Sequence, residues 1–178
     1  MQKKNSDSLN RLSLEAYKSE KKIPMIVILD NVRSALNVGA AFRTSDAFSV
    51  ESIFLCGITA KPPHREILKT ALGAENSVSW QYFQNTREAL LDCKDKGYKI
   101  YSVEQTEGST SLEKFTWPDN PIAIVFGNEV DGVDEEILAM GDGSIEIPQF
   151  GTKHSLNISV CQGIVIWELF KKFRLKNV

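Results

Sequence analysis

The 178-residue sequence has few cysteines and few histidines, and this scarcity excludes several kinds of site. Its three cysteines, Cys56, Cys93 and Cys161, lie far apart and form no CxxC pair, so neither a zinc ribbon nor a disulfide framework is indicated. No cluster of His, Cys and carboxylates has the spacing of metal ligands, and we expect no metal. This use of cysteine favours a reducing compartment, and we expect a cytoplasmic protein.

Long apolar runs and the common nucleotide-binding and hydrolase motifs are also missing. The first residues, MQKKNSDSLNRL, lack the apolar core of a signal peptide, and no stretch approaches the roughly 20 apolar residues that cross a membrane. The glycine fingerprints of dinucleotide-binding proteins and P-loops do not occur, which argues against a nucleotide-dependent oxidoreductase. No GxSxG motif is present.

Charge is unevenly distributed along a chain whose net charge is only −2. Residues 1–22 hold six basic and three acidic residues, and residues 171–178 hold four basic residues and no acidic ones. Two interpretations of the basic ends stay open: a solvated surface, or contacts with the phosphate backbone of a nucleic acid. We expect residues 1–22 to form a basic arm that contains a short helix near 8–20, and residues 23–178 to form one domain.

From residue 25 onward, apolar runs alternate with helical stretches. The runs predict strands near 25–29, 52–55, 78–83, 99–103, 122–126 and 144–147, several of them apolar at nearly every position, as in strands that are covered on both faces. Helices are predicted near 38–48, 64–71, 85–96, 134–140 and 155–174. The alternation predicts an α/β fold: a mainly parallel sheet with helices on both faces.

Four polar or glycine-rich stretches follow predicted strands. They are the segment after the first strand, VEQTEGS at 103–109, GNEVDG at 127–132 and PQFGTKHS at 148–155. Ligands of open parallel sheets bind beyond the carboxyl ends of the strands, so we expect these loops to meet at one edge.

The segment after the first strand holds polar residues that a packing helix does not require. Asn37 is a candidate N-cap for a helix that begins at Val38, and the small residues Gly39 and Ala40 would let another molecule approach its first turn. Arg43 would reach back over the loop, where its fork of donors suits a phosphate or a carboxylate. The alternative is a surface arginine paired with Asp30 or Asp46.

The other loops hold further candidates. Glu129, inside GNEVDG, is placed to accept hydrogen bonds from the backbone or from a ligand. Ser155 is a candidate N-cap for the last helix, and Asn157 would lie in the first turn of that helix. Because the helix is apolar nearly all round, we expect it to be buried against more than one layer, and a second subunit is one candidate for such a layer.

Three of these stretches together resemble the sequence motifs of a known protein family. The segments N37-V-G-A-A-F-R43-T, F-G127-N-E129-V-D-G132 and I147-P148-Q-F-G151-T-K-H-S155-L-N157-I-S resemble, in order, the three motifs of the SpoU (TrmH-like) family of SPOUT RNA methyltransferases. The resemblance covers about residues 23–172. Gln149 departs from it, because many members have Met or another apolar residue there.

The resemblance implies a fold, an activity and a site. The fold would contain a deep C-terminal trefoil knot, an exception to the usual unknotted topology. The activity would be methyl transfer from S-adenosylmethionine to a ribose 2′-hydroxyl of tRNA or rRNA, in a homodimer packed through residues 38–48 and 155–174. The cofactor would be held by Val103, Glu104, Gly127, Gly132, Ile147 and Leu156, and the reaction end would be formed by Asn37, Arg43, Glu129, Ser155 and Asn157.

Two alternatives to ribose methylation lie within the same fold. A catalytically silent RNA-binding protein is disfavoured because the five reaction-end residues occur together, and base methylation is disfavoured by the Ser-Leu-Asn motif. A guanidinium stays protonated at neutral pH, so we expect Arg43 to grip a phosphate and to stabilise developing negative charge. Ser155, Asn157 or a water molecule would then carry the proton away.

Overall fold

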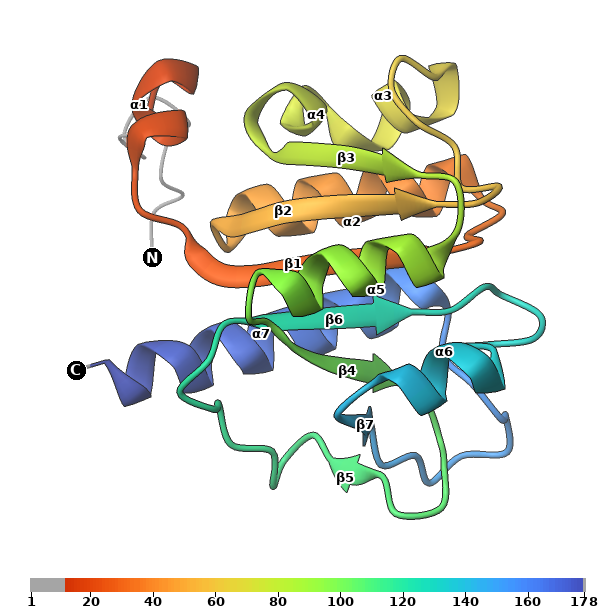
Figure 1. The fold of residues 1–178 in the computed structure, drawn as a ribbon. Helices are drawn as coiled ribbons and strands as arrows, with labels where there is room; N and C mark the ends of the chain where they lie inside the picture. The colour runs from red at the N-terminus through yellow and green to blue at the C-terminus, as the bar shows by residue number, and fades with distance from the viewer. Residues whose placement is uncertain (1–11, 178) are drawn as a thin grey trace, which may run out of the picture.

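Two strands that are apolar along almost their whole length form the centre of the sheet. In the computed structural model, which describes residues 12–177, β1 (Ile23–Asp30) and β6 (Ile122–Phe126) are buried at all positions except Pro24. They pair in parallel, and the full order of the seven strands is β3-β2-β1-β6-β4-β7-β5, with every pair parallel. The predicted parallel α/β architecture is therefore confirmed (Figure 1).

The remaining strands extend the sheet on both sides of this centre. They are β2 (Val50–Cys56), β3 (Ser79–Phe83), β4 (Lys99–Val103), β5 (Thr110–Ser111) and β7 (Gly143–Glu146). All six predicted strands occur, with shifts of at most a few residues at their ends. The two-residue strand β5 was not predicted, because so short a segment has no measurable period.

Helices cover both faces of the sheet. They are α1 (Leu14–Ser19), α2 (Ala35–Ala47), α3 (Arg65–Ala71), α4 (Ala74–Ser77), α5 (Thr86–Asp95), α6 (Glu135–Met140) and α7 (Ile158–Lys176). One hydrophobic core joins the sheet to α2, α3 and α7, and a second core joins the opposite face to α5 and α6. The predicted helices of the domain are all present, and the one-turn helix α4 was not predicted.

Two predicted helix starts are wrong, and in both cases another residue is the cap. Helix α2 begins at Ala35 instead of Val38, and the Ser34 side chain, not that of Asn37, accepts a hydrogen bond from the first turn. Helix α7 begins at Ile158, and Asn157 is its N-cap in place of Ser155. Each stretch contains more than one residue type that can cap a helix, so the sequence alone does not decide between them.

The described part of the arm and the basic tail lie at the edge of the sheet where the strands begin (Figure 1). The predicted helix near 8–20 is helical at Leu14–Ser19, and residues 1–11 of the arm lie outside the described part of the chain. In the tail, Lys171 and Lys172 pair with Glu168, and Lys176 pairs with Asp119. The pairs with Glu168 lie within α7, whereas Lys176, and Lys172 through a hydrogen bond to the Glu113 carbonyl, hold the helix to the segment before β6. A contact with phosphate would have to compete with these partners.

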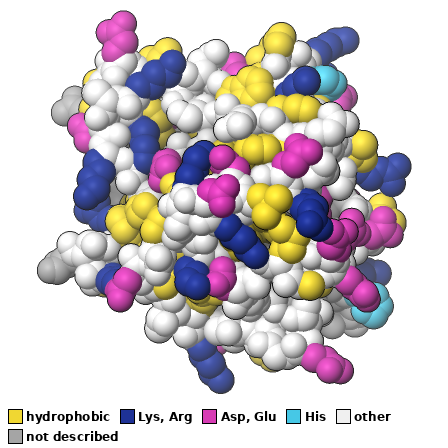
Figure 2. Space-filling view, in the orientation of Figure 1, with side chains coloured by type: hydrophobic (Ala, Val, Ile, Leu, Met, Phe, Trp, Pro, Cys, Tyr) yellow, Lys and Arg dark blue, Asp and Glu magenta, His cyan; other side chains and the backbone are white. Residues whose placement is uncertain are grey.

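The face that carries α5 and α6 has no broad region of one charge. Lys and Arg side chains alternate there with Asp and Glu side chains (Figure 2). No helix within residues 12–177 is both long and apolar enough to cross a membrane.

Candidate cofactor and reaction site

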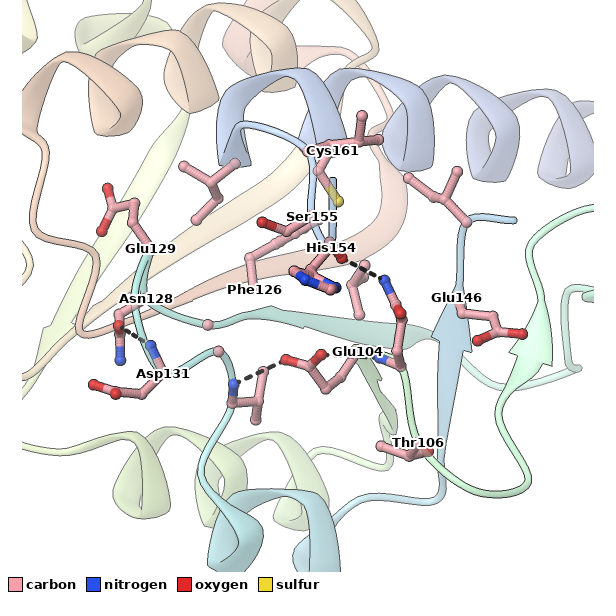
Figure 3. Close-up of a pocket in the computed structure, with 18 of the residues that line it drawn as sticks. Glu104, Thr106, Phe126, Asn128, Glu129, Asp131, Glu146, His154, Ser155 and Cys161 are labelled. Atoms are coloured by element: carbon pink, nitrogen blue, oxygen red, sulfur yellow. Dashed lines mark hydrogen bonds between the residues drawn. The ribbon is translucent and has the colours of Figure 1, made fainter. Parts of the chain in front are cut away.

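A cavity of about 710 Å³ lies beyond the carboxyl ends of β4, β6 and β7. Its walls come from the segments that follow these strands and from the first turn of α7 (Figure 3). The volume is within the range of small-molecule sites. The loops predicted to meet at this edge therefore do meet, except for the loop after β1, which is joined to the cavity only through a hydrogen-bonded side chain.

The loop after β6 approaches itself too closely for any side chain at its first residue. A Cβ atom added to Gly127 would lie 2.1 Å from the carbonyl carbon of Gly132. Gly132 has a φ of +70°, a conformation that favours glycine. The Asn128 side chain accepts hydrogen bonds from the backbone N–H groups of Val130 and Asp131. The sequence GNEVDG thus forms a closed, internally bonded turn whose backbone faces the cavity.

The carboxylate of Glu104, which directly follows β4, holds this turn in place. One oxygen of Glu104 accepts a hydrogen bond from the Gln105 N–H at 2.9 Å, and the other accepts from the Val133 N–H at 3.2 Å (Figure 3). A Cβ on Gly132 would lie 2.2 Å from the Glu104 carboxylate. Glu104 therefore fixes the position of the GNEVDG turn relative to β4, in addition to lining the cavity.

A second carboxylate ties the turn to the start of α2. Glu129 accepts hydrogen bonds from the backbone N–H groups of Arg33 and Ser34, at 2.9 and 3.1 Å, and from the Asn37 side chain at 3.0 Å. The partial removal of Glu129 from water would alone raise its pKa, but these bonds, together with one from its own backbone N–H, hold the pKa below its usual value. The anion at the N-terminus of α2 is thus the protein's own carboxylate.

The loop between β1 and α2 has few backbone donors left for a ligand. Asn31 adopts a positive φ of 52°, and its side chain accepts a hydrogen bond from the Ile58 N–H. Thr59 accepts a hydrogen bond from the Val32 N–H and donates one to the Leu29 carbonyl. Together with the bonds to Glu129, these contacts fix the loop. These bonds occupy N–H groups ahead of α2, and the expected approach of another molecule to the first turn of the helix itself stays a prediction.

The small residues of α2 have a different use from the one expected. Gly39 is buried, and a Cβ there would lie 2.1 Å from the Thr70 hydroxyl of α3 and 2.4 Å from the Ile67 carbonyl. The glycine therefore lets α3 pack closely on α2, and it does not open a path for RNA.

Arg43 does not line the cavity within one chain. It lies, exposed, in a separate hollow of about 470 Å³ between α2 and α3, which Phe48, Lys69 and Thr70 also line. Neither alternative carboxylate binds it: Asp30 bonds Thr86 and Asn31, and Asp46 bonds Ser77.

The entry to α7 forms the upper wall of the cavity. Ser155 lines it without a hydrogen bond from any described residue, while the Asn157 side chain accepts bonds from the Ser159 N–H and hydroxyl. Behind them, burial raises the pKa of the Cys161 thiol to about 11, so that it stays protonated at neutral pH. The cavity therefore has hydroxyl, amide and carboxylate groups, but no thiolate nucleophile among its described residues.

Comparison with known proteins places this geometry in a family. The model of the SpoU rRNA Methylase family matches residues 24–167. The chain belongs to this family. The family predicted from the three motifs is thus confirmed.

Several proteins similar to this chain are named as RNA methyltransferases or tRNA modifying enzymes. The tRNA (guanosine(18)-2′-O)-methyltransferase of Thermus thermophilus is 30% identical over 93% of this chain and 84% of its own length. The structure of the Aquifex aeolicus TrmH/SpoU tRNA modifying enzyme superposes with a TM-score of 0.82 at 28% identity, over 92% of this chain and 82% of that one. An AdoMet-bound rRNA methyltransferase from Sinorhizobium meliloti gives 0.79 at 26% identity, over 90% and 61%.

All six residues predicted to hold a cofactor line the cavity of the SpoU chain: Val103, Glu104, Gly127, Gly132, Ile147 and Leu156. Of the five predicted reaction-end residues, Glu129, Ser155 and Asn157 line the same cavity. Asn37 is joined to it by its bond to Glu129, and Arg43 lies outside it. The roles assigned to these residues stay predictions.

The lining of the cavity is acidic. Four carboxylates line it, those of Glu104, Glu129, Asp131 and Glu146, and no Lys or Arg from the described residues does so. Such a lining favours a cationic ligand and opposes a phosphorylated one.

Sequence reasoning missed several residues that build the site. Ser34 and Thr59 shape the loop after β1, and Glu146 and Cys161 line the cavity. Only Ser34 carried a readable signal, as a capping residue directly before α2. The other three became neighbours of the site through the pairing of strands and the packing of α7.

Proposed function

We propose that the SpoU chain is an S-adenosylmethionine-dependent RNA methyltransferase that methylates a ribose 2′-hydroxyl in tRNA or rRNA. The predicted class of enzyme agrees with the family match and with the named relatives. One observation carries the proposal: an acidic cavity that excludes Lys and Arg lies beside the hydroxyl and amide groups of Ser155 and Asn157, within the described residues.

The residues of the cavity fit the cofactor. S-adenosylmethionine carries a sulfonium and an ammonium group, and it supplies an electrophilic methyl when bound. The acidic lining would attract both cationic groups, and the apolar side chains of Val103, Ile147 and Leu156 would contact the adenosine. Because Gly127 has no side chain, its backbone can lie directly against a ligand. The same lining disfavours NAD, whose phosphates would face carboxylates.

In the proposed reaction, the protein's residues align the ribose and stabilise charge. Ser155 and Asn157 orient the 2′-hydroxyl beside the cofactor site, and alignment alone can supply several kcal/mol of the rate enhancement. Glu129 acts as a positioning residue, because its oxygens already accept bonds from Arg33, Ser34 and Asn37. Ser155, Asn157 or a water molecule relays the hydroxyl proton to the solvent.

Arg43 grips the phosphate next to the reacting ribose, and we propose that it does so across a homodimer. Beside it, the packed helices α2 and α7 expose a set of large apolar side chains, which we call the α2/α7 face: Leu36, Val160, Ile164 and Trp167, exposed by 42, 51, 39 and 51%. Exposed patches of this kind mark interaction sites. Pairing through this face would bring Arg43 of one protomer toward the cavity of its partner.

The dimer is tested by placing a charge in the α2/α7 face. We expect Trp167→Glu to sediment as a monomer and to lose methyl transfer, while the chain stays folded by circular dichroism. A dimer of unchanged mass at the same concentration would rule out this interface.

We also propose that the chain forms a trefoil knot, that it consists of an arm and one domain, and that it is located in the cytoplasm. Strand β7 lies between β4 and β5, although β5 precedes it in the chain, so the segment that links β4 to β5 must pass round β7. This topology supports a knot, because α7 then returns to α2. The arm at 1–22 and the domain at 23–178 remain the proposed parts.

The experiment that tests the function separates it from a silent RNA-binding role. We expect calorimetry to detect binding of S-adenosylmethionine, and we expect the protein to methylate RNA from cells that lack the gene. Arg43→Lys, which keeps the charge but loses the planar fork, should lower kcat/KM at least about tenfold. Cofactor binding or RNA binding without any methyl transfer would favour the silent protein.

A further inference from the structure

Phe150 is an aromatic residue whose side chain is exposed to solvent. It is 97% exposed, more than any other large apolar residue among those described. It belongs to the loop that leads from β7 to α7. In this loop Gln149 on one side, and His154 and Ser155 on the other, line the cavity. Phe150 itself does not line it, so the ring lies outside the cavity, in the loop that borders it.

The surroundings of Phe150 leave room for a flat partner. A Cβ added to the adjacent Gly151 would meet no atom within 4 Å, so no other part of the described chain approaches the loop at this point. Within residues 12–177 the ring joins no aromatic pair. A phenylalanine in this position loses the free energy of burial unless something else covers it.

We propose that Phe150 stacks on a nucleobase of the RNA, next to the ribose that is methylated. The inference rests on the proposed function, because the reacting ribose must reach Ser155 and Asn157 in the same loop as Phe150. Proteins hold splayed bases of single-stranded RNA by stacking them on aromatic rings. Lys153, three residues further on, is exposed and forms no ion pair with a described residue, so its ammonium is available to the adjoining phosphate.

The test compares variants that separate an aromatic ring from mere apolarity. Phe150→Ala and Phe150→Leu both remove the ring, Phe150→Trp keeps one, and Leu175→Ala removes a side chain that is 71% exposed at the far end of α7. Each protein is assayed on one preparation of RNA from cells that lack the gene. The readouts are KM for RNA, kcat, the Kd of S-adenosylmethionine and the sedimentation mass.

We expect Phe150→Ala and Phe150→Leu to raise KM for RNA by about 5- to 150-fold, the range that corresponds to loss of one stacked base. Phe150→Trp should stay within a few fold of the wild type, and Leu175→Ala should not differ from it. The cofactor Kd and the mass should be unchanged in all variants. Lys153→Ala should reduce the slope of log Kd for RNA against log salt by about 1, whereas Phe150→Ala should leave that slope unchanged.

Four results would overturn the inference: an unchanged KM in Phe150→Ala, a Leu variant as active as the Trp variant, a weakened cofactor Kd, or a change of mass. The third would make Phe150 a cover for the cofactor, and the fourth would make it a subunit contact. If the wild-type protein transfers no methyl group, the proposed function fails. RNA retention on filters by the same variants then still shows whether Phe150 contacts RNA.

Discussion

Glu129→Gln is the substitution that isolates the tie between the GNEVDG turn and α2. The native carboxylate accepts hydrogen bonds from two backbone N–H groups and from the Asn37 amide. The glutamine has the same shape but only one acceptor oxygen, and its NH₂ group would face a donor. At least one N–H near the start of α2 therefore loses its partner, and the charge that favours the helix N-terminus is removed.

The expected loss of stability follows from these bonds. A hydrogen bond to a charged group is worth about 1.5–3 kcal/mol, and a neutral bond about 0.5–1.5 kcal/mol. Glu129 is exposed to solvent, which screens its charge, so we take the low end of the difference. We predict that Glu129→Gln lowers the free energy of unfolding by about 1–2 kcal/mol and Tm by about 2–8 °C. Glu107→Gln, an exposed glutamate without a hydrogen-bonded side chain among the described residues, should change neither.

The contribution of Glu129 to the free energy of unfolding should fall as the pH is lowered. Because folding lowers the pKa of Glu129, its contribution is complete above the unfolded value of about 4.3 and is lost as the pH falls through the folded value. Urea unfolding at a fixed protomer concentration should thus show the full difference between wild type and variant at pH 7, and a smaller one at pH 4. A difference that is absent at pH 7, or equally large at both pH values, would refute the reasoning.

Three further predictions concern single positions. Gly127→Ala forces a Cβ into the backbone of the facing turn, so the Kd for S-adenosylmethionine should rise at least about tenfold in calorimetry, whereas Gly143→Ala, with only ordinary contacts, should leave it unchanged. Gln162 is fully buried and neither amide atom has a partner among residues 12–177, so Gln162→Leu should raise the free energy of unfolding by about 1–3 kcal/mol; a loss in urea titration would show that the amide is satisfied. Asn157→Ala removes the cap of α7 and should cost about 1 kcal/mol in thermal unfolding, and equal values for Asn157→Ala and Ser155→Ala would contradict that role.

The sequence predicted the sheet well because its strands are apolar at nearly every position. The rule that ligands bind beyond the carboxyl ends of parallel strands then located the cavity, since GNEVDG and PQFGTKHS follow β6 and β7 directly. Length, pattern and chain order carry this information, and all three can be read without knowledge of distant contacts.

The details that failed depend on contacts between distant segments. The Asn37 side chain does not cap α2 but donates a hydrogen bond to Glu129, which lies 92 positions away in the chain. Position 39 must be glycine so that α3 can pack closely on α2, and no local pattern in the sequence of α2 reveals this contact. The separation of Arg43 from the cavity reflects the face of α2 on which it lies, and a proposed second subunit is needed to bring the two together.

The central claim is that this cavity holds S-adenosylmethionine against a ribose oxygen. The direct test is to incubate the protein with RNA from cells that lack the gene and with a cofactor whose methyl group carries deuterium. The RNA is then digested to nucleosides and analysed by mass spectrometry. The account predicts the label on the ribose of a 2′-O-methylated nucleoside, and its loss in Arg43→Ala. A label on a base, or cofactor binding without labelled RNA, would contradict it.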